Sequence, residues 1–208
     1  MTPNLLALSP TTLPDTPPLE YVEAAAAAGY DAVGLRLSRS PLFPFHPVAG
    51  NAGLVRELKR ALARSRLGVL DILSFYLQPV TNIEAFAAPL ELGAELGARY
   101  ALVAGDDSDG LRLRDNLARF CDLARPFGVT AAVEFAVIRP LATLGQTLRL
   151  LADAVARTRS SASTRSTTFA AVARWRSSAR STRGSFRTRR SPTACLDRAS
   201  PIRESSDA

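Results

Sequence analysis

One acidic residue, Glu134, interrupts an otherwise apolar run, VTAAVEFAVI at 129–138. Burying a carboxylate among apolar residues is costly unless it pairs with a cation or ligates a metal ion. In parallel α/β folds functional groups collect at the carboxyl ends of strands, and Glu134 lies towards that end of the run. We therefore predict that Glu134 is a metal ligand or a catalytic residue. The alternative interpretation is a carboxylate that pairs with an arginine such as Arg139 or points out of a frayed strand.

The sole histidine of the sequence, His46, lies in the proline-rich segment SPLFPFHPVAG. This segment follows the apolar run DAVGLRL at 31–37, so in a parallel sheet it joins Glu134 at the carboxyl-end face. We predict that His46 binds substrate there. The alternative is an incidental histidine in a surface loop.

Three aspartates, Asp106, Asp107 and Asp109, follow a further apolar run in AGDDSDG. A D-x-D run resembles part of a cation-binding loop, but the remaining EF-hand ligands are absent. Capping of the following helix is the favoured interpretation, because Asp at a helix N-terminus complements the helix dipole. Asp71 and Ser74 are weaker candidates. The sequence contains no GxSxG, HExxH, P-loop or CxxC motif.

Strand-like and helix-like segments alternate over residues 1–156, and most of the helix-like segments end at a glycine-bearing turn. The apolar runs are 4–9, 31–37, 68–75, 99–105 and 129–138. The helix-like segments are 18–29, 51–68, 82–98, 110–128 and 141–156, and Pro89 is expected to kink or interrupt the third. Wholly apolar strands alternating with helices indicate a parallel sheet covered by helices.

The connection after the first apolar run decides between two architectures. A doubly wound nucleotide-binding sheet usually has a glycine-rich phosphate loop there, but this chain has SPTTLPDTPPLE, with four prolines and no glycine. A complete barrel has eight βα units, whereas the pattern supplies about five. We predict an α/β fold, a partial (β/α)₈ barrel over residues 1–156.

Residues 157–208 have a different composition, rich in Arg, Ser, Thr and Ala, with one Leu, one Ile and one Val. Such a segment buries too little apolar surface to offset its ordering entropy, so we predict a disordered or irregular basic tail. The chain has 25 Arg and one Lys, which indicates a GC-rich coding sequence. A displaced reading frame in such DNA yields this composition, and residues 162–168 permit a neighbouring frame that reads V-D-A-L-H-Y. We hypothesise a frameshift near residue 155.

The charge is divided in the same way. Residues 1–154 hold 14 basic and 16 acidic residues, whereas residues 155–208 hold 12 and 3, so the net charges are −2 and +9. The globular part needs no polyanion as partner, and the tail lacks the interleaved aromatics of a nucleic-acid arm.

The sequence begins without the features of a secretory signal and has no apolar stretch long enough to span a membrane, and its two cysteines lack metal-like spacing. A cytoplasmic protein is expected.

Four segments carry a family resemblance: ALSPTTLPDTPPLEYVEAAAAAGYDAVGLRL, VLDILSFYLQP, ARYALVAGDDSD and VTAAVEFAV. Together they make residues 3–154 similar to the sugar phosphate isomerase/epimerase proteins of the xylose-isomerase-like TIM-barrel superfamily. In that family the acid at the end of the fifth strand binds a divalent metal and transfers a proton, and Glu134 matches that position. The resemblance implies Mg²⁺ or Mn²⁺ as cofactor and a sugar or sugar phosphate as substrate.

The other metal ligands of the family, an Asp, a His and a final Glu on later strands, are not encoded in frame here. We therefore expect metal-dependent proton transfer on a hydroxy-ketone sugar as the ancestral activity, and a truncated chain that is weakly active or inactive. Two alternatives remain open: a non-catalytic truncated product, and a basic-tailed nucleic-acid-binding protein.

Overall fold

The computed structural model describes residues 5–160 and 169–173 as one parallel sheet with helices against it. The six strands of the sheet follow chain order, each pairing in parallel with the next. The strands are β1 (Ala7–Leu8), β2 (Ala32–Arg36), β3 (Gly68–Leu77), β4 (Tyr100–Gly105), β5 (Thr130–Phe135) and β6 (Phe169–Ala173).

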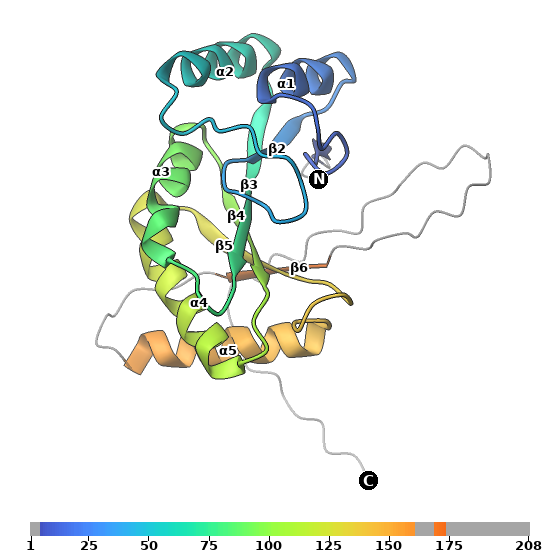
Figure 1. Ribbon diagram of the computed structural model, residues 1–208. Coiled ribbons are helices and arrows are strands. Elements are labelled where there is room, and N and C mark those ends of the chain that lie inside the picture. The colour runs from blue at the N-terminus through green and yellow to red at the C-terminus, as the bar shows by residue number, and fades with distance from the viewer. Residues whose placement is uncertain (1–4, 161–168, 174–208) are drawn as a thin grey trace, which may run out of the picture.

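Five α-helices connect these strands and lie one after another along one face of the sheet (Figure 1). They are α1 (Pro18–Ala27), α2 (Ala52–Ser65), α3 (Ala87–Glu95), α4 (Gly110–Ala124) and α5 (Leu144–Ser160), with 3₁₀ helices η1 (Ile83–Phe86) and η2 (Arg125–Phe127) beside α3 and α4. A doubly wound sheet reverses its strand order and carries helices on both faces. Neither feature is present in the described residues, so the predicted partial (β/α)₈ barrel is confirmed.

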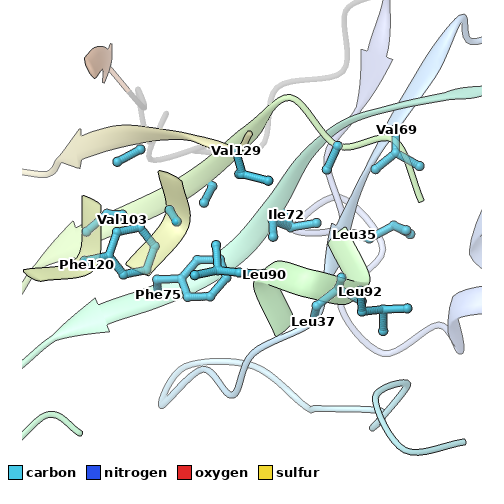
Figure 2. Close-up of a cluster of buried hydrophobic side chains, with 14 of the residues drawn as sticks. Leu35, Leu37, Val69, Ile72, Phe75, Leu90, Leu92, Val103, Phe120 and Val129 are labelled. Carbon is cyan, nitrogen blue, oxygen red and sulfur yellow. The ribbon is translucent and has the colours of Figure 1, made fainter. Parts of the chain in front are cut away.

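The main hydrophobic core lies between the sheet and the helices (Figure 2). Alternate strand residues point to this side, among them Val103 and Phe75, and helix residues such as Leu90 and Phe120 pack against them. The rings of Phe75, Phe86 and Phe120 form a cluster with centroids 5.1 to 5.8 Å apart. This cluster packs η1 and α4 against β3.

Two helix boundaries differ from the predicted segments for local reasons. The segment 82–98 is divided at Ala87 into η1 and α3, and Pro89 lies in the first turn of α3, where its missing N–H is not needed. α5 begins at Leu144 rather than 141, because Thr143 and Gln146 form a reciprocal capping box. Pro89 therefore does not interrupt α3 itself, and the predicted interruption of the segment 82–98 lies just before it, where η1 meets α3.

The structure departs from the sequence-based expectation in the segment after residue 156. α5 continues to Ser160, and residues Phe169–Ala173 form β6, which pairs with β5 where an irregular tail was expected. The reason is the short apolar run FAAVA, which the composition of the tail as a whole conceals. Residues 161–168 and 174–208, including the segment with the displaced V-D-A-L-H-Y frame, lie outside the described residues.

Candidate active site

Glu134 lies on the face of the sheet opposite the helices, which we call the inner face. Its neighbours Ala131 and Val133 belong to the helix-facing core, whereas Ala132 packs in a separate cluster with Leu73 and Leu102. Alternate residues of a strand point to opposite faces, so Glu134 shares the inner face with Ala132. Glu134 pairs with Ala104 of β4 and with Val172 of β6, so the strand is not frayed at this position.

Sheet register brings a tyrosine to the same level as this carboxylate. Glu134 pairs with Ala104, and Ala104 pairs with Tyr76 on β3. Two strand spacings of about 4.8 Å separate the backbones of Tyr76 and Glu134. Because the residue between them is an alanine, β4 places only a methyl group between the phenol and the carboxylate.

Above this level, five polar side chains from β2–β5 and their loops make contact. Arg139, whose side chain is 8% exposed, forms an ion pair with Asp106 at 3.1 Å and stacks on Tyr76 with its guanidinium carbon 4.7 Å from the ring centroid. Gln78 donates to Asp106 at 3.0 Å, and the hydroxyls of Ser40 and Tyr76 are 3.2 Å apart. We call Ser40, Tyr76, Gln78, Asp106 and Arg139 the mouth cluster. The alternative interpretation of the sequence paired Arg139 with Glu134. In the structure the ion pair of Arg139 is with Asp106.

The other two aspartates of AGDDSDG have structural roles. Asp109 is the N-cap of α4, and its carboxylate accepts from the backbone N–H groups of Leu111 and Arg112. The buried Asp107 carboxylate accepts from Nε and Nη2 of Arg112 at 2.6 and 2.7 Å, which holds its pKa below the usual range. Helix capping is therefore confirmed for Asp109, and the hypothesis of a D-x-D cation site is not supported.

Of the two weaker candidates in β3, Asp71 reaches the inner face. A Cβ added to Gly34 on β2 would lie 2.2 Å from Oδ1 of Asp71, so the glycine makes room for that carboxylate. Ser74 is half-buried near the end of β3, and nothing in the structure assigns it a role.

His46 lies between the loops that follow β1 and β2. Its Nε2 is 3.3 Å from the backbone oxygen of Asp15, and its pocket is lined by prolines, Tyr21 and Arg36. The guanidinium of Arg36 donates to backbone carbonyls of the two loops at 3.0 to 3.4 Å. The pocket holds about 30 Å³, enough for a few water molecules and too little for a sugar. Substrate binding by His46 stays a prediction.

The described residues do not by themselves fit a divalent metal ion. Across residues 5–160 and 169–173, no group of three or more His, Cys, Asp or Glu side chains is placed to hold one. Mg²⁺ and Ca²⁺ require six or more oxygen ligands, and Asp106, which shares the inner face with Glu134, is engaged by Arg139. A cation bound at Glu134 therefore needs ligands from outside these residues.

Tyr76, Gln78 and Arg139 were not singled out as site residues from the sequence. The signal that could have found them is the period of two in FYLQ, residues 75–78, where Phe75 and Leu77 face the core and Tyr76 and Gln78 face the other way.

In the part of the chain that the structure describes, no helix is long and apolar enough to cross a membrane.

The fold is similar to that of xylose isomerase-like TIM barrels, and solved structures of that class match the chain. The xylose isomerase domain containing protein from Salmonella typhimurium LT2 matches at a TM-score of 0.59 with 15% identity, covering 72% of this chain and 56% of its own. The IolI protein with a bound zinc atom matches at 0.57 with 18% identity, covering 73% and 59%. The D-allulose 3-epimerase from Methylomonas sp. in complex with D-allulose matches at 0.54 with 16% identity, also covering 73% and 59%.

At these identities the matches confirm the fold that the sequence resemblance implied. This chain spans less than two thirds of the length of each of the three structures. No protein-family model matches the sequence. No curated protein matches it either.

Proposed function

We propose that this chain is part of a sugar or sugar phosphate isomerase or epimerase, in which Glu134 transfers a proton on a hydroxy-ketone sugar. The observation that carries the proposal is the position of Glu134, on the inner face at the carboxyl end of β5. The likeness to a D-allulose 3-epimerase solved with its sugar supports it. Active sites of (β/α)₈ barrels lie at this end of the strands.

The proposed reaction requires mainly that the carboxylate lies beside the carbon atom that loses its proton. Isomerisation and epimerisation both remove a proton from a carbon next to a carbonyl and return it to the same or the neighbouring carbon. Glu134 is a base on the inner face, and the mouth cluster above it presents hydroxyl, amide and guanidinium groups that suit sugar hydroxyls. A bound Mg²⁺ or Mn²⁺ would polarise the substrate oxygens. Because the later metal ligands that the family resemblance implies are not encoded in frame, we expect this chain to be weakly active or inactive.

A frameshift near residue 155 is part of the proposal. We infer that residues 157–208 are read in a displaced frame and that the intended frame continues the barrel with further βα units. The DNA sequence around codon 155 tests this directly. The displaced frame must stay open and keep an apolar period beyond the stop codon of the tail. Early stop codons in that frame would remove the frameshift from the proposal and leave Glu134 unaffected.

An activity assay tests the role of Glu134. The 208-residue chain and a frame-restored version are incubated with D-fructose or D-allulose and with Mg²⁺ or Mn²⁺, and epimer formation is followed by chromatography. We expect metal-dependent activity in the restored protein and little or none in this chain. In the restored protein, Glu134→Gln should lower kcat by about 10²- to 10⁴-fold, the usual contribution of a general base. Glu91→Gln, an exposed position on α3, is the matched control.

A non-catalytic product is the second candidate, because residues 5–160 and 169–173 supply no metal-binding group of side chains. It predicts that this chain binds neither ketose nor Mn²⁺ measurably, while the restored protein does both.

The alternative of a nucleic-acid-binding tail concerns residues that lie largely outside the described ones, so it stays a prediction. Salt-sensitive binding of nucleic acid that is lost on deletion of 157–208 would favour it.

A further inference from the structure

The mouth cluster contains an arginine in an unusual electrostatic position. Arg139 is more than nine-tenths buried, and one face of its guanidinium lies on the ring of Tyr76. Within the described residues, Asp106 is the acidic group that pairs with it, through a single Nη1–Oδ1 contact of 3.1 Å. A guanidinium has five N–H donors in a planar fork, so this contact leaves most of its hydrogen-bonding capacity for a ligand.

The geometry of this contact suits exchange with an anion. A phosphate presents several acceptor oxygens and takes two parallel hydrogen bonds from a guanidinium, whereas Asp106 contacts the guanidinium through one oxygen. The neutral hydroxyl of an unmodified sugar cannot replace a carboxylate in this way, because it brings no charge.

Asp106 is not left isolated when Arg139 changes partner. Its second oxygen accepts from Nε2 of Gln78 at 3.0 Å, and its side chain is 26% exposed to water. Its backbone N–H donates to the carbonyl of Leu77, which holds the loop in place independently of the side chain. The exchange therefore leaves no charged group buried without a partner.

The distance to Glu134 fits a phosphorylated sugar. Asp106 lies two residues beyond Ala104, and Ala104 pairs with Glu134 across the sheet. A rise of about 3.3 Å per residue and a strand spacing of about 4.8 Å put the Cα atoms of Asp106 and Glu134 about 8 Å apart. Because Arg139 contacts Asp106, its guanidinium lies at the same end of the sheet as Glu134. A pentose or hexose phosphate has the length to reach from one side chain to the other, with its carbonyl end at the carboxylate and its phosphate at the guanidinium.

We propose that Arg139 binds the phosphate group of a phosphorylated hydroxy-ketone sugar, and that it does so by leaving Asp106. The proposal deepens the proposed function and rests on it, because the reacting carbons must lie at Glu134. Arg139 is then the residue that distinguishes a sugar phosphate from a free sugar. Asp106 competes with the substrate for the same guanidinium.

Isothermal titration of the full 208-residue chain with D-fructose, D-fructose 6-phosphate and inorganic phosphate tests this. We expect the phosphate ester to bind about 10- to 100-fold more tightly than the free sugar, the value of one or two charge-assisted hydrogen bonds. Arg139→Gln should abolish that preference, and Arg139→Lys should keep part of it. Asp106→Asn should increase the affinity for the ester, because it removes the competing and repelling carboxylate.

The opposite effects of the two substitutions separate ligand binding from support of the fold. If Arg139 and Asp106 only held the loops together, both variants would weaken binding of the ester, and that result overturns the proposal. Arg149→Gln, at an exposed position of α5, is the matched control and should change neither affinity. Thermal unfolding of each variant shows whether it remains folded.

The outcomes also separate this proposal from the one on which it rests. If D-fructose binds and Arg139→Gln leaves the preference for the ester intact, the phosphate site is refuted and the proposed function stands. If inorganic phosphate binds in an Arg139-dependent way and the ester binds no more tightly than phosphate, the sugar site is refuted. If D-glucuronate binds in an Arg139-dependent way and the ester does not bind, the ligand group of Arg139 is a carboxylate. The proposal of a phosphate site is then refuted.

Discussion

A glycine on α3 gives a stringent test of how the helix layer is packed on the sheet. A Cβ added to Gly93 would lie 2.5 Å from Cδ1 of Ile72 on β3, and 3.1 and 3.3 Å from its Cγ2 and Cγ1. Ile72 is fully buried, so it has no free volume into which to turn. We expect Gly93→Ala to cost about 1–3 kcal/mol in overpacking, of which better helix propensity returns about 1 kcal/mol.

Urea unfolding followed by circular dichroism measures this loss, and a double-mutant cycle locates its cause. Ile72→Val removes Cδ1, the closest atom, and by itself costs about 0.5–1.5 kcal/mol. The double variant should be more stable than the sum of the two single effects predicts, with a coupling of about 1 kcal/mol. Gly145→Ala is the control, since the nearest atom to its added Cβ is 3.7 Å away. It should be neutral or slightly stabilising.

Two results would refute this reasoning. The first is a Gly93→Ala variant as stable as the parent chain. The second is strict additivity in the cycle, which would mean that the added methyl group and Cδ1 of Ile72 do not meet. Either would place α3 further from β3 than the structure has it.

Three further perturbations test separate contacts. Tyr21→Phe deletes the 2.6 Å hydrogen bond from a buried phenol to a backbone carbonyl of β1 and should cost about 1–3 kcal/mol in urea unfolding, the penalty of an unsatisfied buried group. Asp107→Asn should lower Tm by several degrees at neutral pH. Arg112 lowers the pKa of Asp107, so the pair stabilises the fold above the ordinary carboxyl pKa of about 3.9, and the difference in Tm should vanish as the pH falls through the lower folded value. Burial raises the pKa of the Cys121 thiol, so a variant with the other cysteine removed should react with a thiol reagent only after addition of denaturant.

The parts of the site that follow from local pattern were predictable from the sequence. Glu134 breaks an apolar strand near its end, and the alternation of a strand decides which face receives it. The capping role of Asp109 depends only on the helix that begins at the next residue. The resemblance to a sugar isomerase fold likewise depended on residues within continuous segments.

The pairing of Arg139 with Asp106 was not predictable in the same way. It depends on which residue of β4 stands beside β5 and on how the following loop turns, and neither is a property of a short segment. The sequence offered Glu134 as the nearer partner of Arg139. β6 was missed for a different reason, because a five-residue apolar run is lost in a segment judged by its composition as a whole.

The strict agreement between strand order and chain order has a consequence for synthesis. Among the described residues, each strand after β1 pairs with the strand made just before it, so none of these pairings waits for a segment encoded later. A growing polypeptide emerging from the ribosome can therefore add one strand and helix at a time to an already folded edge.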